Sequence, residues 1–471
     1  MNKTKIICTL GPASNTEEVI GQLLDNGMNV ARVNFSHGTH ESHGKTIDMF
    51  RKVRDAKAMA AAVMLDTKGP EIRLGNFEKG SVELKRGSQF TFTAKEVLGD
   101  ESRVSVTFKD LPRQMKKGEF ILVDDGMMKF QVLEVSEDEL LCETITSGKL
   151  SDHKGVNIPD KSLDMEYLSE TDKSDLLFGI EKDVDYVAAS FMRREEDARD
   201  LRTFLDDNGG QKIQIIAKIE NLEGIHKFEE ILKIVDGIMV ARGDMGVEVD
   251  YERLPGIQKN IIRRCKELGK IVITATQMLE SMIENPMPTR AEITDVANAV
   301  FQGTSAVMLS GESAAGKYPV EAVKAMSRII KQSEKDFEKY GDTDGTPEGS
   351  REDITNAVGH GAGTIARDIK AKALIAITKT GYTASKMSKY RPSVPIIGET
   401  PEMKSYHQMA LCWGVFPVHI VDTKDLEELF TQSVEAAKKT GFVSKGDHVV
   451  ITAGVPVGVA GSTNIIRVET V

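Results

Sequence analysis

Cysteine is scarce in this sequence and is never closely paired. Its 471 residues include four cysteines, none of them in a C-x-x-C pair: Cys8, Cys142, Cys265 and Cys412. Cysteines this few and this far apart argue against a disulfide framework and against a cysteine-based zinc site. They favour a reducing environment, and we expect a cytoplasmic protein.

Long apolar runs and an excess of positive charge are also missing. No stretch reaches the roughly 18 apolar residues of a membrane-spanning helix, and the apolar run near the N-terminus is too short for a signal peptide. Lys and Arg number 61 against 72 Asp and Glu, for a formal charge of −11. That balance argues against nucleic-acid and membrane-surface partners, which favour basic patches, but it leaves local pockets for phosphate open.

What the sequence does contain is an alternation of short apolar runs with helical segments. Eight alternating strands and helices are typical of a (β/α)8 barrel. The competing architecture is a doubly wound open sheet, but the Gly-rich dinucleotide fingerprint is absent after the first run. The eight runs cover residues 5–11, 28–38, 60–69, 184–191, 212–220, 236–244, 270–277 and 304–313.

Two regions interrupt or follow this alternation. Residues 72–160 alternate with period two and contain no convincing long helix, which predicts a small all-β insertion. The insertion leaves the C-terminal face of the barrel, where a lid would exclude water. After a loop-like stretch at 341–350, a second α/β unit begins. We therefore expect an α/β protein with three parts: a (β/α)8 TIM barrel (1–69 and 171–345), an inserted β-barrel lid domain (70–170) and a C-terminal α/β effector-binding domain (346–471).

Polar residues stand where most of the predicted barrel strands end. Residues two apart in an extended chain share a face, so Lys218 and Glu220 should emerge side by side. One such pair could be a structural ion pair, but polar ends on six of eight strands favour a shared pocket at the C-terminal face. The residues are Arg32, Asn34 and Ser36; Asp66, Thr67 and Lys68; Lys218 and Glu220; Asp244; Thr276; Ser310 and Glu312.

The polar residues at some of these strand ends predict a site that binds a metal ion and a phosphoryl group. Glu220 and Asp244 end successive strands and could share one Mg2+, which commonly takes one or two carboxylates. Lys218 beside them supplies a compact charge for a phosphoryl group in transfer. Gly243, at a predicted helix start, offers backbone N–H groups to a carboxylate, and Thr276 adds a hydroxyl. Together these residues predict a pocket for a small, multiply charged anion.

Two further clusters have two interpretations each. Asn34, Ser36, Asp66 and Thr67 offer one carboxylate among neutral oxygens, which suits a monovalent cation or a hydrogen-bonded loop network. The run "TKTGYTAS" at 378–385 combines hydroxyls with a helix start, as in a phosphate cradle, although an ordinary N-cap fits equally.

Several stretches, taken in order, resemble the hallmark segments of pyruvate kinase, and the likeness extends over essentially the whole chain. The resemblance implies the last step of glycolysis, transfer of the phosphoryl group of phosphoenolpyruvate to ADP, which gives pyruvate and ATP. The stretches are "TKIICTLGPAS", "GMNVARVNFSHG", "LDTKGPEIR", "HKGVNIP", "IIAKIENLEG", "IMVARGDMGVE", "ITATQMLESM", "PTRAEITDVANAV" and "MLSGESAAGKYP".

The resemblance also implies roles for individual residues, with Mg2+ (or Mn2+) and K+ as cofactors. Lys218 would stabilise the phosphoryl group, and Thr276 would lie near the enolate carbon. The remaining implied sets are Glu220 and Asp244 for Mg2+; Arg32, Lys218, Gly243, Asp244 and Thr276 for the substrate; Asn34, Ser36, Asp66 and Thr67 for K+; and Asn34, His37, Arg73 and Lys154 for the nucleotide.

Regulation and assembly are implied in the same way. The family's effector phosphate loop matches Thr378, Lys379, Thr380, Gly381 and Thr383, so activation by a sugar phosphate or nucleotide is expected. The residues that would choose that effector lie partly in 453–464, and the sequence does not identify it. A homotetramer is expected by similarity. Glu71 stands where potassium-independent relatives resemble one another in having lysine, which favours potassium dependence.

Two other functions remain open from the residues. A Mg2+-dependent enolate lyase or aldolase would also use Glu220 and Asp244, but it would need no nucleotide clamp of the kind that Arg73 and Lys154 suggest. A non-catalytic sugar-phosphate sensor would have a vestigial barrel, and the intact Lys218, Glu220 and Asp244 argue against it.

Overall fold

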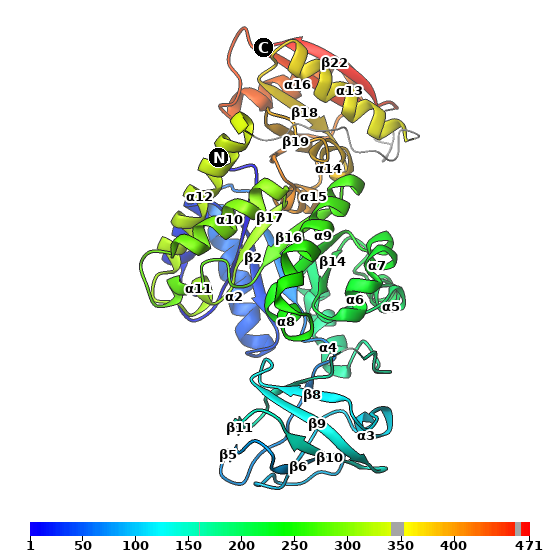
Figure 1. The fold of residues 1–471 in the computed structure, drawn as a ribbon. Helices are drawn as coiled ribbons and strands as arrows, with labels where there is room; N and C mark the ends of the chain where they lie inside the picture. Colours follow the sequence, from blue (N-terminus) through cyan, green and yellow to red (C-terminus); the bar gives the residue numbers. More distant parts are fainter. Residues whose placement is uncertain (160, 341–352, 457–462) are drawn as a thin grey trace.

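The structure is a computed structural model that describes residues 1–159, 161–340, 353–456 and 463–471. The molecule is elongated, with the β-rich insertion at one end, the barrel in the middle and the C-terminal α/β unit at the other end (Figure 1). The predicted boundary loop at 341–350 and half of the 453–464 stretch lie outside the described residues.

The central barrel confirms the predicted fold. Its strands are parallel and close in the order β1-β17-β16-β15-β14-β13-β3-β2. Because helices cover the barrel outside and side chains fill its inside, both faces of each strand are buried, which explains the nearly continuous apolar runs. The strands are β1 (Lys5–Thr9), β2 (Met28–Asn34), β3 (Ala62–Asp66), β13 (Tyr186–Ala189), β14 (Gln214–Ile219), β15 (Gly237–Ala241), β16 (Ile271–Ala275) and β17 (Ala306–Leu309).

Helices follow the barrel strands, and local capping fixes where several of them begin. Thr39, Ser169 and Thr289 each form a capping box with the residue three positions later, satisfying backbone N–H groups of the first turn. The helices are α1 (Glu17–Asp25), α2 (His40–Ala56), α4 (Glu170–Glu181), α5 (Glu195–Asp207), α6 (Leu222–His226), α7 (Phe228–Ile234), α8 (Arg242–Glu248), α9 (Leu254–Leu268), α10 (Arg290–Gln302), α11 (Gly311–Ala314) and α12 (Pro319–Tyr340), with 3-10 turns η1 (Tyr251–Arg253) and η2 (Glu280–Ile283).

The insertion is a β domain with its own core, and hydrogen bonds link the two edges of its main sheet, where Leu74 after β4 bridges Val106 after β7. The described strands form a seven-stranded sheet, β4-β12-β8-β9-β10-β6-β7, and a separate two-stranded sheet, β11-β5. Phe90, Phe92 and Phe130 pack in its centre. The elements are β4 (Ile72–Arg73), β5 (Ser81–Leu84), β6 (Gln89–Thr93), β7 (Arg103–Ser105), α3 (Leu111–Gln114), β8 (Phe120–Val123), β9 (Met128–Val135), β10 (Glu139–Thr144), β11 (Gly148–Ser151) and β12 (Gly155–Asn157).

The C-terminal α/β unit packs against the N-terminal face of the barrel, opposite the lid. Tyr186, which starts β13, donates its hydroxyl to the carbonyl of Gln408 at 2.6 Å, and Lys5 at the start of β1 donates to the carbonyl of Val415 at 2.6 Å. The sheet order is β20-β19-β18-β21-β22, with only the β21–β22 pair antiparallel. Its elements are α13 (Ile354–Asp368), β18 (Ala373–Ile377), α14 (Tyr382–Ser388), β19 (Ile396–Thr400), α15 (Met403–Gln408), η3 (Met409–Leu411), β20 (Val415–His419), α16 (Leu426–Lys439), β21 (His448–Gly454) and β22 (Thr463–Thr470).

Two expectations drawn from what the sequence lacks can be compared with the structure. All four cysteines are free and buried, in agreement with the absence of a disulfide framework. In the part of the chain that the structure describes, no helix has both the length and the apolar character needed to cross a bilayer.

Candidate active site

Lys218 is the centre of a buried polar cluster at the C-terminal end of the barrel strands. Its Nζ lies 3.1 Å from Oδ1 of Asp66, 3.1 Å from Oε1 of Glu220 and 2.7 Å from Oγ of Ser190. The alternation of β14 places Lys218 and Glu220 on one face, as predicted. Although burial alone would lower the pKa of Lys218, the charges of Asp66 and Glu220 raise it above its ordinary value. The ammonium is therefore held charged.

Asp66 joins this lysine to the neighbouring strands. Its carboxylate accepts from Nζ of Lys218 through Oδ1 and from Nε of Arg32 through Oδ2, the latter at 2.6 Å. Arg32 also donates to the hydroxyl of Thr9 at 2.8 Å. Burial alone would raise the pKa of Asp66, but Arg32 and Lys218 hold it below its ordinary value, so the carboxylate is ionised.

Glu220 and Asp244 face the same region from neighbouring strand ends. Glu220 is 1% exposed and accepts a hydrogen bond of 2.6 Å from the backbone N–H of Phe191. Burial raises the pKa of Glu220 to about 7, Lys218 opposes the rise and the nearby charge of Asp244 adds to it. The side chain of Asp244 is half-buried and makes no hydrogen bond or ion pair with any residue in the described ranges. Two carboxylates, one of them unengaged, are thus available at this end of the barrel.

Gly243 and Thr276 meet beside this pair. The backbone N–H of Gly243 donates to Oγ1 of Thr276 at 2.9 Å, so the predicted anion-binding N–H is already engaged in this structure. Arg242 donates to the carbonyls of Ala275 and Thr276, at 3.2 and 2.6 Å, and pairs with Asp295. Thr276 has a φ of 63°, an uncommon value for a β-branched residue. The turn after β16 is therefore held in a strained form by the arginine beside it.

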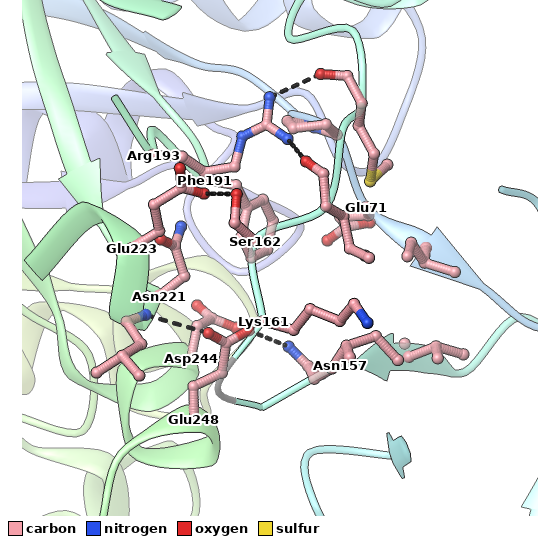
Figure 2. Close-up of a pocket in the computed structure, with 18 of the residues that line it drawn as sticks. Glu71, Asn157, Lys161, Ser162, Phe191, Arg193, Asn221, Glu223, Asp244 and Glu248 are labelled. Atoms are coloured by element: carbon pink, nitrogen blue, oxygen red, sulfur yellow. Dashed lines mark hydrogen bonds between the residues drawn. The ribbon is translucent and has the colours of Figure 1, made fainter. Parts of the chain in front are cut away.

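A cavity of about 530 Å3 opens between this end of the barrel and the lid. Figure 2 shows Asp244 and Glu248 reaching it from the barrel, with Glu71 and Lys161 coming from the lid side. Glu248 accepts from Asn157 of the lid at 3.4 Å. The lid thus covers the mouth of the barrel and is tied to it by polar contacts.

Two predicted nucleotide residues, Arg73 and Lys154, also line this cavity, and both are ion-paired. Arg73 pairs with Glu71 at 2.7 Å and donates to the carbonyl of His153 at 2.8 Å. Lys154 pairs with Asp124 at 2.8 Å. The charge of Glu71 is therefore already offset within the chain. That weakens the reason for expecting a potassium ion to offset it.

Comparison with known proteins bears directly on this arrangement. The family model "Pyruvate kinase, barrel domain" matches residues 1–323, and "Pyruvate kinase, alpha/beta domain" matches residues 356–469. The chain belongs to the pyruvate kinase family. It is 45% identical over 476 residues to a pyruvate kinase of Clostridium perfringens and 46% identical over 475 residues to one of Clostridium acetobutylicum, with 100% of each chain covered. A pyruvate kinase of Geobacillus stearothermophilus is 46% identical over 471 residues, which cover 100% of this chain and 80% of the relative.

The residues predicted to bind potassium lie in neighbouring segments at the ends of β2 and β3. Asn34 and Asp66 are paired across β2 and β3, and Oδ1 of Asn34 accepts from the N–H of Ser36 at 3.2 Å. Thr67 accepts through its carbonyl from the hydroxyl of Ser190, at 2.6 Å. The Asp66 carboxylate is directed at Arg32 and Lys218. Asn34, Asp66 and Thr67 thus accept hydrogen bonds, as the network interpretation expects, and the potassium interpretation names the same three residues together with Ser36.

The predicted effector loop begins α14 without a side-chain cap. Its N-cap is Gly381, whose φ of 79° favours glycine, and a Cβ there would approach Met409 to 3.0 Å. The N-cap of the alternative interpretation is therefore a glycine, with no side-chain hydrogen bond to the helix start. Thr383 is buried, and its hydroxyl lies 2.6 Å from that of Thr463 on β22. Thr378 is buried and Lys379 partly buried, while Thr380 is exposed.

Other predicted strand-end residues lie away from the cluster or serve the scaffold. His37 is exposed at the turn after β2. Glu312 is fully buried and accepts from the N–H groups of Leu279 and Ser310, so it tethers two loops. His43 stacks on Phe35 with ring centroids 4.2 Å apart.

Sequence reasoning missed Ser190. It follows β13, is 1% exposed and bonds to Lys218, to Asp66 and to the Thr67 carbonyl. The signal was present in the sequence, because a serine that ends an apolar run is the same pattern that identified the other strand ends.

Proposed function

We propose that the chain transfers the phosphoryl group of phosphoenolpyruvate to ADP, giving pyruvate and ATP. The observation that carries the proposal is the buried Lys218 ammonium, held between Asp66 and Glu220 beneath a lid that contributes Arg73 and Lys154. Phosphoryl transfer is catalysed chiefly by positioning and charge stabilisation, and a fixed ammonium provides both. Arg32 would bind the substrate phosphate from the same cluster, while Gly243 and Thr276 would bind its carboxylate.

The donor set fits a magnesium ion. Glu220 follows β14, and Asp244 lies in the first turn of α8, which follows the neighbouring strand β15. Among the residues of the described ranges no group of three or more His, Cys, Asp or Glu side chains is suited to a metal, so the site would have two carboxylates. Magnesium commonly takes one or two carboxylates and leaves its other positions to substrate and water. When bound, it would supply charge neutralisation for the phosphate and the enolate oxygen, with Mn2+ as an alternative ion.

Potassium is proposed at Asn34, Ser36, Asp66 and Thr67. Three neutral oxygens with one carboxylate suit a weakly hydrated monovalent cation. We expect activity to depend on KCl at constant ionic strength, with NaCl as the matched salt. Full activity without potassium, unchanged when KCl is added, would contradict this assignment.

The catalytic proposal is tested by measuring pyruvate released from phosphoenolpyruvate with and without ADP. Release should require ADP and should be lost in Lys218→Met. Lys233→Met, which changes an exposed lysine on α7, is the matched control and should retain activity. Release without ADP would instead support an enolate lyase, and no turnover under any cation or effector condition would support a sensor.

The proposal also includes an effector site and an oligomeric state. We place a sugar-phosphate or nucleotide effector at Thr378, Lys379, Thr380, Gly381 and Thr383, and we propose a cytoplasmic homotetramer. The uncapped start of α14 supports the effector site, because backbone N–H groups at a helix start bind phosphate. Activity measured against candidate sugar phosphates, and mass measured by light scattering, test the two assignments.

A further inference from the structure

A second cavity lies far from the lid, between the barrel and the C-terminal α/β unit. It has a volume of about 260 Å3 and is lined by Lys270 at the base of β16 and by Thr380, Tyr382 and Lys386 around α14. A smaller cavity of about 20 Å3 adjoins it and shares Lys270 with it. Helices α9 and α14, which flank this region, lie close together in Figure 1.

The walls of these two cavities carry an excess of positive charge. Lys266, Lys270, Lys386 and Arg391 form no ion pair with any residue in the described parts of the chain, although the protein as a whole is acidic. Lys389 lines the smaller cavity beside them. Asp236 is the one carboxylate among the residues lining either cavity, and it already accepts a hydrogen bond of 2.8 Å from the N–H of Ile215.

The cations instead hold backbone carbonyls. Lys270 donates to the carbonyl of Val235 at 2.6 Å, Lys386 to that of Leu268 at 3.2 Å, and Arg391 to that of Gly303 at 2.7 Å. A neutral carbonyl compensates a buried charge less well than an anion does. Burial and repulsion both affect Lys386: burial, then the charges of Lys389 and Lys270, lower its pKa.

Arg391 is the most incompletely satisfied of these groups. Its Nε and Nη1 are buried without any hydrogen-bond partner, and its guanidinium lies over the ring of Trp413, 4.3 Å from the ring centre. Leaving a buried charged donor unpaired destabilises a protein. An oxyanion nearby would reduce that cost and the repulsion among the cations together.

From these observations we propose that the interdomain cavity is a binding site for a phosphate group, either as inorganic phosphate or on a small phosphorylated metabolite, held by Lys270 and Lys386 and supported by Arg391. The site is separate from the active site and lies on the barrel side of the Thr378–Thr383 loop. The buried hydroxyl of Thr383 faces Thr463 on β22 instead. Because its cations come from both units, the ligand would join the barrel to the C-terminal unit.

The chain carries its own reporter for this site. Trp413 is the sole tryptophan, and it lines the smaller cavity. The protein is titrated with sodium phosphate in one arm and with ribose 5-phosphate in the other, while the fluorescence of Trp413 is measured. NaCl keeps the ionic strength constant. A saturable change in either arm supports the site and identifies the source of the phosphate. No saturable change in both arms overturns it.

Matched variants locate the binding. Lys386→Gln and Lys270→Gln should each weaken it at least about ten-fold, since each removes a charge-assisted hydrogen bond. Lys386→Arg should retain it, as should Lys372→Gln, which removes an exposed charge from the same unit outside the cavity. Wild-type affinity in both Gln variants overturns the proposal. Loss of phosphate binding in Thr383→Ala, together with wild-type binding in Lys386→Gln, would also overturn the proposal. The anion would then lie on the other side of the loop.

Discussion

A buried carboxyl group in the C-terminal unit should make stability depend on pH. Glu399, near the end of β19, is fully buried, and neither of its carboxyl oxygens has a hydrogen-bond partner. The hydroxyl of Ser433 on α16, also buried and without a partner, is the nearby polar group. Burial raises the pKa of Glu399 from 4.5 to about 8, and Ser433 offsets only part of the rise. The folded protein therefore keeps this group protonated at neutral pH.

The magnitude follows from the difference between the folded and unfolded states. A raised folded pKa means that the native state binds the proton more tightly, so stability is fully present below pH 4.5 and is lost as the pH rises to about 8. At about 1.4 kcal/mol for each unit of pKa difference, the loss is about 3 kcal/mol at pH 7 and about 5 kcal/mol above pH 8. Glu399→Gln removes the ionisation. The free energy of unfolding of this variant, relative to that of the wild type, should therefore rise with pH by that amount.

The assay is urea unfolding followed by Trp413 fluorescence, at pH values from 5 to 9. Trp413 lies in the same unit as Glu399, so its signal reports the unfolding of that unit. Glu402→Gln, which removes an exposed carboxylate three residues later, is the control and should show little change with pH. If the difference in unfolding free energy between Glu399→Gln and the wild type stays constant across this pH range, whatever its sign, the reasoning is refuted.

Three further predictions concern the active-site cluster. Lys218→Met should lower kcat by at least about 10²–10³, as expected for a charge aimed at the transition state, and initial rates beside circular dichroism will separate this from unfolding. Ser190→Ala should lower kcat about ten-fold by freeing the ammonium of Lys218, with Ser190→Thr restoring part of the rate if the hydroxyl matters. Because Glu220 has a pKa of about 7, protons should compete with Mg2+ below that pH, and the Mg2+ concentration for half-maximal activity should rise up to about ten-fold per pH unit. A half-maximal concentration independent of pH between 5.5 and 7 would contradict the last prediction.

The barrel could be predicted because its signal is local and repeated. Each buried strand is a short apolar run, and six of the eight predicted strand ends carry polar residues, so both the fold and the position of the site follow from spacing. The neighbouring positions of Lys218 and Glu220 needed only the alternation of an extended chain. The bridge between Leu74 and Val106 in the lid was not predictable in the same way, because period two does not show which edges of a sheet meet.

The partners of the site residues could not be read from the sequence, because they depend on register. Asp66 meets Lys218 only because β13 lies between β3 and β14, with Ala188 paired to Asp66 and Ala189 to Ala217. Ser190 enters the cluster through the same two pairings. Glu71 and Arg73 are two residues apart in the sequence, yet only the structure shows that Arg73, predicted to bind nucleotide, pairs with this carboxylate.

The two cationic regions differ in how their charge is balanced, and this gives them different responses to ligands. At the active site Lys218 and Arg32 are neutralised by Asp66 and Glu220, so the cluster is ordered before any substrate arrives. Between the units, Lys270 and Lys386 donate to backbone carbonyls, and neither forms an ion pair within the described ranges. A ligand at the first site exchanges existing interactions for new ones, whereas a phosphate at the second adds charge compensation that the free protein lacks. Phosphate should therefore stabilise the contact between the units more than a substrate bound under the lid does.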